Sequence, residues 1–342
     1  MEATAAHRAP RDRPWGITMH AVRLHAFGPA GNLTYERVED PVPGPGQVLV
    51  AVRAAGVHLL DTALREGMRG PGPAPAELPT IPGREIAGVV EALGPGTPAD
   101  WLGKRVVTHL GFAPGGYAEL AVADAGRLHE VPERLDFAEA VAMIGTGRTA
   151  MGIVRFAEPG PGDVVAVPAA AGGLGTLLVQ YARNAGATVI GLAGGPEKTA
   201  LVARGGAGLA VDYTAPDWPA RLEGHRGKVT VVYDGVGGDV ARTLVGLLAP
   251  GGRHVVFGWS SQGVRSDSPY LVEGVSVNVL GPAMMRRAGG PDPMRTLESR
   301  SLAEAAAGRL TPAVHRFPLA RAADAHRALE NRATTGKVVL EP

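Results

Sequence analysis

Six short apolar runs recur between residues 164 and 280, and their spacing limits the fold more than any other feature of the chain. The segments between the runs read as helices. Continuous runs of Val, Ile and Leu are typical of parallel strands covered on both faces, and the intervening segments are long enough for right-handed crossovers. The pattern therefore predicts an α/β protein with a doubly wound, six-stranded parallel Rossmann sheet, with strands at 164–168, 188–192, 209–213, 230–233, 254–257 and 275–280.

A glycine-rich turn, AAGGLG at residues 170–175, follows the first run. It resembles the dinucleotide fingerprint G-x-G-x-x-G, with Ala170 in the place of the first glycine. We expect Ala170 to allow the tight turn, Gly172 to let the backbone approach a pyrophosphate, and Gly175 to let the next helix pack closely on the sheet. Amide groups at the start of that helix then point at the phosphates. A flexible loop is the alternative, but the position between an apolar strand and an amphipathic helix favours dinucleotide binding.

The end of the second run indicates which dinucleotide is bound. An NAD site has an acidic side chain about 20 residues after the turn, which binds the ribose hydroxyls. Here the run ends in Gly194 and Gly195, and Lys198 follows in the first turn of the next helix. This arrangement leaves room and a positive charge for a 2′-phosphate, so we expect NADPH as the cofactor. Lys198 as an ordinary solvated lysine, partly offset by Glu197, is the alternative.

The rest of the chain predicts a second unit. Short strands separated by Pro and Gly clusters are typical of a mostly β, barrel-like domain, here with strands at 20–25, 47–56, 85–91 and 105–109. After residue 280 we expect a helix at 303–308, a strand at 313–318, an alanine-rich helix through Asn331 and a strand at 337–340, all returning to the barrel. The predicted domains are a flexible tail (1–18), a barrel domain (19–144 and 281–342) and a Rossmann domain (145–280).

Composition excludes several classes of function. The net charge is +1, which gives no overall field to attract nucleic acid or an anionic membrane. No apolar run approaches the ~20 residues that a membrane-spanning helix requires. The chain contains no cysteine, so disulfides, thiolate nucleophiles and thiolate metal sites are absent. The first 18 residues have no apolar segment of a secretory signal, and we expect a cytoplasmic protein.

Several motifs together resemble one known family, the quinone oxidoreductase and zeta-crystallin-like branch of the medium-chain dehydrogenase/reductase superfamily. The likeness extends over nearly the whole chain from about Met19, although Ala166 replaces the leucine that is usual in the family. It is carried by Gly162-Asp163, the turn at 170–175, Gln180 and Arg183, and by the segments 57–62, 82–88, 231–237, 256–258 and 329–336. The resemblance implies a GroES-like β-barrel catalytic domain, a Rossmann domain and NADPH in the cleft between them.

The resemblance also implies which residues contact the cofactor. Four positions would surround the adenosine 2′-phosphate, and they are Gly194, Lys198, Tyr213 and Arg332. Five would lie along the pyrophosphate and the nicotinamide, and they are Thr149, Gly173, Leu174, Phe257 and Gly258. There is an alternative for two of these residues. Tyr213 would only end the third strand, and Arg332 would be an ordinary surface arginine.

The zinc that relatives of this family use is not expected here. Those relatives hold the metal with cysteine and histidine, but His58 stands where the first thiolate would be and Arg84 where a ligand histidine would be. A catalytic zinc site normally has three protein ligands. Hydride transfer without a metal favours quinones and α,β-unsaturated carbonyls, because conjugation spreads the developing negative charge.

His58, Asp61 and Thr62 are the candidate catalytic residues. An imidazole has an ordinary pKa of about 6.5, so His58 can donate a hydrogen bond and return a proton. A loop histidine without a chemical role is the alternative. Asp61 and Thr62 match the family motif, and Asp61 would orient His58 or the nicotinamide ribose. Ala63, Met151 and Gly152 are smaller or less aromatic than their counterparts in relatives, which predicts a wider pocket that is less suited to stacking a flat quinone.

The resulting hypothesis is an NADPH-dependent oxidoreductase that transfers hydride to a quinone or an α,β-unsaturated carbonyl. An enoyl-thioester reductase of a biosynthetic pathway is the enzymatic alternative, and a non-catalytic NADPH- or RNA-binding protein is the alternative from another class. The near-neutral charge argues against RNA. We also predict a homodimer, because the run at 275–280 would form an uncovered edge strand, and such edges are usually paired.

Overall fold

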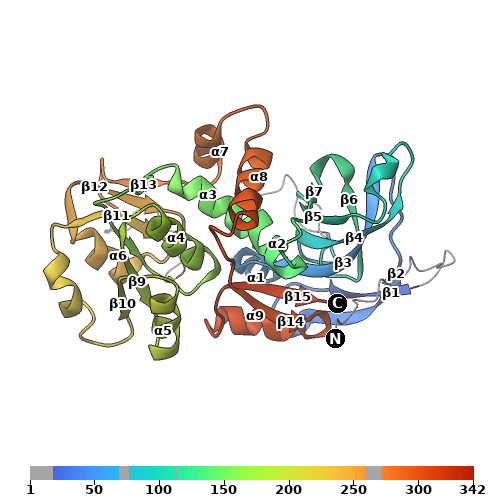
Figure 1. Ribbon diagram of the computed structural model, residues 1–342. Helices are drawn as coiled ribbons and strands as arrows, with labels where there is room; N and C mark the ends of the chain where they lie inside the picture. The colour runs from blue at the N-terminus through green and yellow to red at the C-terminus, as the bar shows by residue number, and fades with distance from the viewer. Residues whose placement is uncertain (1–17, 69–76, 112–114, 259, 261–270) are drawn as a thin grey trace, which may run out of the picture.

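The computed structural model describes residues 18–68, 77–111, 115–258, 260 and 271–342. Within this part of the chain, Figure 1 shows two lobes side by side, one built around each of two sheets. The predicted tail lies outside the described residues except for Thr18, which begins the first strand. In the described part, every helix is too short or too polar to cross a membrane.

The first lobe is the predicted Rossmann unit. Its strands are all parallel and lie in the order β10-β9-β8-β11-β12-β13, which is the doubly wound order with the first strand of the unit at the centre. The helices α4, α5 and α6 surround this sheet (Figure 1). The strands are β8 (Val164–Val167), β9 (Thr188–Ala193), β10 (Leu209–Asp212), β11 (Val229–Asp234), β12 (Leu248–Val256) and β13 (Ser276–Asn278), and the helices are α4 (Gly173–Asn184), α5 (Pro196–Arg204) and α6 (Gly238–Val245).

The second lobe is the predicted β-barrel, and both ends of the chain contribute to it. Seven strands form one sheet, in the order β14-β15-β3-β4-β5-β7 with β6 paired to β3. The hairpin of β1 and β2 bridges to it at Ala118 and Thr80. The strands are β1 (Thr18–Leu24), β2 (Leu33–Glu39), β3 (Gln47–Val57), β4 (Glu85–Leu93), β5 (Arg105–His109), β6 (Leu120–Asp124), β7 (His129–Glu130), β14 (Val314–Pro318) and β15 (Lys337–Glu341).

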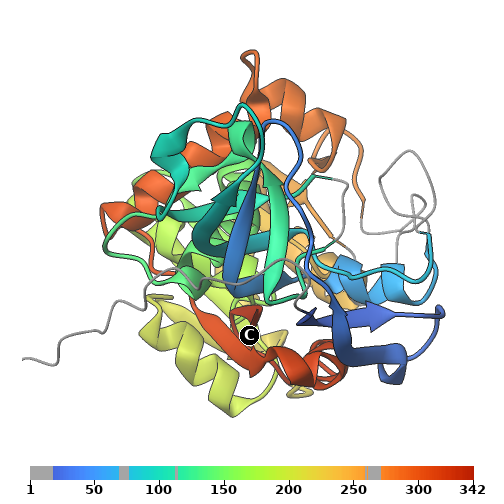
Figure 2. The same cartoon turned by 90° about the vertical axis from the view of Figure 1, so that its right-hand side faces the viewer.

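The C-terminal strand joins the two ends of the chain. β15 pairs antiparallel with β3, with Val339 opposite Gly56, so the chain returns to the barrel as the sequence predicts. Figure 2 looks onto this end of the molecule, with the C-terminal strands beside the last helix, α9 (Ala322–Glu330). The pairing places the start of β15 and the end of β3 next to each other.

A helical layer lies between the two sheets. α2 (Phe137–Ala142) runs without a break through a π-helical turn (Met143–Gly147) into α3 (Arg148–Val154). The residues of this layer belong to the same apolar cluster as strand and helix residues of the Rossmann unit. The predicted domain boundary at 144/145 falls inside the π-turn and the one at 280/281 falls after β13, and these boundaries remain a prediction.

Two helices differ from the sequence prediction. The helix expected at 303–308 is the end of α8 (Pro293–Ala306), which begins ten residues earlier. Its start is set by Asp292, whose side chain accepts from the amide of Arg295, and by proline at the first helical position. The loop expected after Gly56 is instead one more strand residue followed by α1 (Leu59–Arg65), with His58 at its N-cap. A further short helix, α7 (Pro282–Ala288), follows β13.

Candidate active site

The glycine turn, defined as residues 169–175, joins β8 to α4. Its tight geometry depends on Ala169, whose φ of 53° is left-handed, one residue before the alanine to which the sequence assigned this task. Ala170 is instead buried against the sheet. A Cβ on Gly175 would lie 2.3 Å from the Ala169 carbonyl oxygen, so only glycine fits there without a shift of the backbone.

The start of α4 is free of side-chain caps. Gly172 is the N-cap residue and offers no side-chain acceptor. The first amides of a helix lack partners within the helix and carry the positive end of its dipole. An uncapped turn of small residues at this point fits the pyrophosphate of a dinucleotide. Gly173 and Leu174 lie in this first helical turn.

Four of the predicted cofactor residues gather at the end of β9. Lys198 Nζ donates to the backbone carbonyl of Arg332, and a Cβ on Gly194 would lie 3.4 Å from the ring of Tyr213. Burial and then the positive charge of Arg332 lower the pKa of Lys198. Lys198 and Arg332 are two positive charges that repel each other beside Gly194. An anion bound between them would therefore be stabilised.

Asp212 is a polar residue at this end that the sequence reading missed. Its Oδ1 accepts hydrogen bonds from the Gly195 amide at 2.9 Å and from the amide and hydroxyl of Thr214 at 2.9 and 2.6 Å. The Thr214 hydroxyl, followed by the two amides, lowers the pKa of Asp212. The carboxylate therefore holds the turn after β9 in place from the end of the neighbouring strand.

Phe257 and Gly258 pack against the end of β11. A Cβ on Gly235 would lie 2.6 Å from the Phe257 ring, and one on Gly258 would lie 2.9 Å from the Gly235 carbonyl. Phe257 belongs to the same apolar cluster as Ala170. Thr149 lies further away in sequence, on α3, where its hydroxyl donates to the Gly145 carbonyl at 2.9 Å.

A second group of polar side chains, the charge cluster, consists of His58, Glu85 and Lys337. His58 Nε2 lies 2.6 Å from Glu85 Oε1, and Lys337 Nζ lies 3.0 Å from Glu85 Oε2. These are ion-pair contacts, and the two nitrogens themselves lie 2.8 Å apart. The side chains of Glu85 and Lys337 are 1% and 4% exposed, whereas that of His58 is 28% exposed.

Charge and burial oppose each other in the cluster. Burial acts to raise the pKa of Glu85, but His58 and Lys337 together outweigh it and hold that pKa well below its usual range. Burial lowers the pKa of Lys337, and the Glu85 carboxylate opposes this effect. The carboxylate is therefore ionised at neutral pH and needs both neighbours.

Two glycines make room for the Glu85 carboxylate. A Cβ on Gly145 would lie 1.5 Å from Oε1, and one on Gly56 would lie 2.5 Å from Oε2. Gly145 belongs to the π-helical turn, and such turns occur frequently at functional sites. Glycine at 56 and 145 thus lets a charged side chain enter the space between strand and helix.

Asp61 and Thr62 have positioning roles in α1. Asp61 Oδ2 accepts from the His58 amide at 2.8 Å and from the Tyr117 hydroxyl at 3.3 Å. The hydroxyl of Thr62 donates to the Leu59 carbonyl at 2.7 Å, within the same helical turn. Asp61 therefore fixes the backbone of His58.

The hydrogen bonds behind Asp61 have a defined direction. Arg65 has only donors, so the His326 Nδ1 that lies 3.5 Å away accepts, and His326 Nε2–H donates to the Tyr117 oxygen at 3.2 Å. Tyr117 then donates to Asp61. Each hydrogen bond in this series has one possible direction, and the series ends on the Asp61 carboxylate and keeps it in place.

A backbone bridge joins the glycine turn to the charge cluster. Gly172 and Gly336 form an isolated parallel bridge, in which the Gly336 amide donates to the Ala171 carbonyl at 2.8 Å. Lys337 is the next residue, and a Cβ on Gly173 would lie 3.4 Å from its backbone. The turn and the cluster are therefore direct neighbours in the structure.

The described residues do not fit a zinc site. They contain no group of three or more His, Cys, Asp or Glu side chains arranged to hold a metal ion. Arg84 lies with its guanidinium 3.9 Å from Asp61 Oδ1, which adds a positive charge that a metal ion would not favour. His109 lies nearby, and burial lowers its pKa to about 4, so it is neutral at pH 7.

Glu85 and Lys337 are the site residues that sequence reasoning missed. Both follow or lie within segments that carry the family resemblance, 82–88 and 329–336. The available signal was a charged residue at the first position of an apolar strand, which is unusual because charged side chains are rarely fully buried without a partner. Pairing the two required the contact between β15 and β3.

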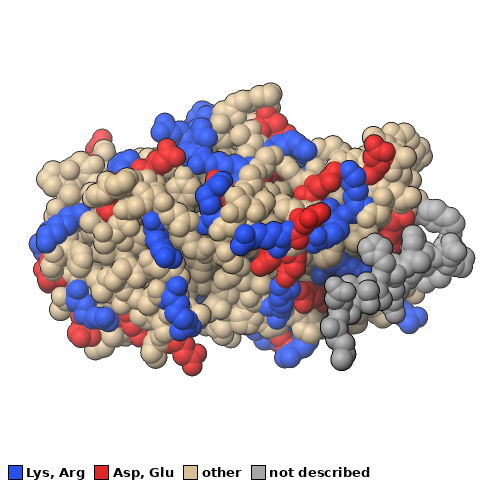
Figure 3. All heavy atoms as spheres, in the orientation of Figure 1, with Lys and Arg blue, Asp and Glu red and all other residues tan. Residues whose placement is uncertain are grey.

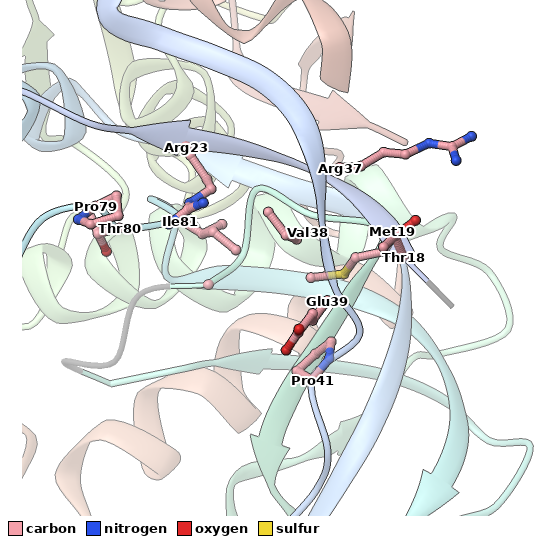
Figure 4. A pocket seen from close by; sticks show the side chains of 11 residues that line it. Thr18, Met19, Arg23, Arg37, Val38, Glu39, Pro41, Pro79, Thr80 and Ile81 are labelled. Carbon is pink, nitrogen blue, oxygen red and sulfur yellow. The ribbon is translucent and has the colours of Figure 1, made fainter. Parts of the chain in front are cut away.

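Two surface features lie apart from this site. A pocket of about 670 Å³ is lined by β1, β2 and the segment 79–81, with Arg23, Arg37 and Glu39 among its side chains (Figure 4). None of the candidate site residues lines it. On the face shown in Figure 3 basic and acidic side chains are interspersed, and basic atoms gather mainly near α7, which carries Arg286 and Arg287 in its last turn.

Comparison with known proteins agrees with this architecture. Residues 44–133 match the family model of the alcohol dehydrogenase GroES-like domain, and residues 173–299 match that of the zinc-binding dehydrogenases. A quinone oxidoreductase of Pseudomonas aeruginosa is 34% identical over 94% of this chain and 99% of its own. A 2-haloacrylate reductase of a Burkholderia species is 34% identical over 95% and 99%.

Solved structures show the same relationship. The Escherichia coli quinone oxidoreductase complexed with NADPH has a TM-score of 0.80 and 28% identity, covering 94% of this chain and 100% of that one. The enzyme from Pseudomonas syringae has a TM-score of 0.79 and 32% identity, covering 95% and 100%. With both lobes, the glycine turn and full-length relatives in agreement, the chain belongs to the quinone oxidoreductase family of the medium-chain dehydrogenase/reductase superfamily.

Proposed function

We propose that this protein is an NADPH-dependent reductase of conjugated acceptors, either quinones or α,β-unsaturated carbonyl compounds, that acts without a metal. The observation that carries the proposal is the bridge between Gly172 and Gly336. It places a turn suited to a pyrophosphate directly beside Lys337, whose ammonium group contacts His58. A cofactor held by the turn and an acceptor held at His58 would share one cleft.

The cofactor would be held from the glycine turn to the end of β9. Ala170, Gly172, Gly173, Leu174 and Gly175 would form the pyrophosphate cradle. Thr149, Phe257 and Gly258 would border the nicotinamide, and Gly194, Lys198, Tyr213 and Arg332 the 2′-phosphate. NADPH supplies the hydride when bound. The paired cations Lys198 and Arg332 favour a phosphate over two hydroxyls at the ribose.

His58 would act on the acceptor. Its ring is the exposed member of the charge cluster, and Asp61 fixes its backbone while Thr62 closes the same helical turn. A conjugated acceptor gains negative charge on oxygen as it is reduced, and a donor held in a water-poor cleft stabilises that charge. His58 would then supply the proton that completes the reduction.

The relatives support both acceptor classes. Quinone oxidoreductases from several organisms are 28–34% identical to this chain. The similar 2-haloacrylate reductase is named for an alkene conjugated to a carboxyl group.

Absorbance of the reduced nicotinamide tests the proposal. Purified protein is mixed with NADPH or NADH and with a panel of quinones, enones, 2-haloacrylates and an enoyl thioester. We expect oxidation of NADPH that depends on a quinone or an activated alkene and is slower with NADH. Absence of acceptor-dependent oxidation across the panel, with binding of NADPH retained, would contradict the proposal.

We also propose a homodimer that pairs through β13. This strand is the last of its sheet, and Val277 on it is 47% exposed. An exposed apolar edge strand invites pairing with another copy. Light scattering at micromolar concentration is expected to give the dimer mass, and Val277→Lys is expected to give the monomer.

A further inference from the structure

The charge cluster is a closed triangle of two nitrogen bases and one carboxylate. Each pair of its three side chains is in contact, at 2.6, 3.0 and 2.8 Å. Glu85 and Lys337 are shielded from water, and His58 is the partly exposed corner. Any change in the charge of Glu85 or Lys337 therefore acts directly on His58.

The distances limit the number of protons that the triangle holds. Two nitrogens at 2.8 Å form a hydrogen bond only when one donates and the other accepts through a lone pair. A carboxylate at 2.6 Å from His58 Nε2 favours a proton on that nitrogen. One buried carboxylate also compensates one positive charge and not two. The triangle thus favours a single cation, either the imidazolium or the ammonium.

The other charged groups around the triangle come from each element packed against it. They are Asp61 from α1, Arg84 from the segment before β4, His109 from β5, Tyr117, and Arg148 from α3. Burial keeps His109 neutral, with a pKa of about 4, and raises the pKa of Tyr117 well above its usual value. Near pH 7 the remaining neighbours therefore keep a constant charge.

Two of these constant charges already have partners. Asp61 accepts from the His58 amide and from Tyr117. Arg148 donates to Glu298 at 3.1 Å. Two charged side chains contact the His58 ring directly. Glu85 brings a negative charge and Lys337 a positive one.

We propose that Glu85 and Lys337 are a pair of positioning residues that set the protonation of His58 in opposite directions, the carboxylate favouring the imidazolium and the ammonium opposing it. The inference rests on the proposed function of His58 as proton donor. In that reaction the hydride brings two electrons and one proton to the acceptor, and His58 gives the second proton to the resulting anion. His58 becomes neutral in this step and is reprotonated from water.

Nuclear magnetic resonance of the histidine rings tests the inference without any substrate. The chain has 10 histidines, and His58→Asn identifies the signal of His58 by its loss. An adjacent charge shifts a titration by about one to three pH units. Glu85→Gln is expected to lower the titration midpoint of His58 by about one unit, and Lys337→Met to raise it by about as much. Lys337→Arg keeps the charge and is the matched control, with a midpoint near that of the natural protein.

The pH profile of kcat/KM is the second readout. The limb of the profile that depends on a protonated group is expected to move to lower pH in Glu85→Gln and to higher pH in Lys337→Met. In His58→Asn this limb is expected to vanish. A merely structural role for Glu85 or Lys337 would lower activity at every pH without moving the limb. Should Lys337→Met fold poorly, Lys337→Gln removes the same charge and is measured in its place.

The outcomes separate the inference from the proposed function. Opposite shifts of the His58 titration in Glu85→Gln and Lys337→Met support the inference. If these shifts occur while the activity limb stays in place, the inference stands and only the role of His58 as proton donor is overturned. Shifts in the same direction, or a midpoint that stays within about 0.3 pH units in all variants, overturn the inference. Opposite shifts in both readouts support the inference and the proposed function together.

Discussion

The glycine turn and the charge cluster lie on the two sides of the bridge between Gly172 and Gly336, but different forces build them. The turn is made by backbone: a left-handed Ala169, a helix start without a cap, and a glycine that touches a carbonyl. The cluster is made by side chains from three distant segments, enclosed where two glycines leave room. One half of the site depends on sterics and the other on electrostatics.

This difference determines how each half responds to change. A steric site fails when an atom is added, and it is indifferent to pH because it holds no titratable group. An electrostatic site fails when a charge is separated from its partner, because an unpaired buried charge is costly. The same substitution, glycine to alanine, therefore probes both halves by different mechanisms.

Gly145→Ala is expected to have the largest effect. Alanine has a higher helix propensity than glycine and on that ground alone would stabilise a helical position by about 1 kcal/mol. At residue 145, however, the new Cβ would lie 1.5 Å from Glu85 Oε1. The carboxylate must leave His58 and Lys337, and separating a buried ion pair costs about 3 to 5 kcal/mol. Urea unfolding followed by circular dichroism measures the loss.

Gly160→Ala is the control for this change. Gly160 has no atom within 4 Å of the position of its Cβ, so little or no loss of stability is expected. A loss below about 1 kcal/mol in Gly145→Ala would show that Glu85 moves without penalty, and the cluster would then be loosely held.

The pH dependence of stability is the next largest effect. Burial lowers the pKa of His326 from the usual 6.5 to about 4. The unfolded chain therefore takes up this proton as the pH falls below about 6.5, before the folded protein does, so stability is present above that pH and is lost toward pH 4. The difference corresponds to about 3 kcal/mol. Calorimetric unfolding from pH 7 to 4 measures it.

His326→Gln sharpens this prediction. Glutamine offers both an acceptor and a donor, so it preserves part of the contact with Arg65 and Tyr117, and it does not titrate. The variant is expected to be less stable at pH 7 but to lose less stability between pH 6.5 and 4. An equal acid slope in both proteins would mean that other groups cause the loss in this range.

The contrast between the two halves also explains what the sequence predicted. The six-stranded parallel sheet, the glycine turn and the return of the chain end could be inferred because each has a local pattern of apolar runs, glycines and prolines. Gly175 was recognisable for the same reason. The comparisons confirm the family and the fold class, while the individual site residues remain predictions.

The charge cluster could not be inferred in this way. Glu85 and Lys337 are 252 residues apart in the numbering and meet because β15 and β4 both flank β3. A charged residue at the first position of an apolar strand is a local signal of burial, but it does not indicate which distant residue is the partner. The start of α8 was missed for another reason, since the capping signal of Asp292 lies among glycines and prolines that read as loop.

Gly175→Ala and Gly172→Ala divide the functions of the glycine turn. A Cβ on Gly175 would lie 2.3 Å from a backbone oxygen that cannot yield, and overpacking of this kind costs about 1 to 3 kcal/mol. A Cβ on Gly172 would lie 3.3 Å from the same oxygen, which the structure tolerates with a small shift. We expect Gly175→Ala to lose both stability and NADPH binding.

Gly172→Ala is expected to keep its stability and lose only the cofactor. Thermal unfolding with and without NADPH measures both properties, because a bound ligand raises the melting temperature. If Gly172→Ala still gains stability from NADPH as the natural protein does, close approach of a phosphate at this residue is wrong.

The smallest expected effect concerns the choice between the two nicotinamide cofactors, and it tests whether electrostatics also act on the steric side of the site. Lys198→Ala removes one of two cations at the end of β9, and loss of one such contact weakens binding by about tenfold, or about 1.4 kcal/mol. The dissociation constant for NADPH should rise by this factor while that for NADH stays the same. Titration calorimetry measures both.

Lys228→Ala is the matched control, because it removes an equal charge from a lysine outside the predicted site, whose ammonium donates to the Gly224 carbonyl at 2.9 Å. Equal weakening of NADPH and NADH in Lys198→Ala would place the lysine at the pyrophosphate. No weakening in Lys198→Ala would leave Arg332, the second cation beside Lys198, as the residue that selects the phosphate. A loss of affinity for NADPH alone in Lys198→Ala would mean that the end of β9 combines sterics and electrostatics. Its glycines would make room for the ribose phosphate, and its lysine would select that phosphate.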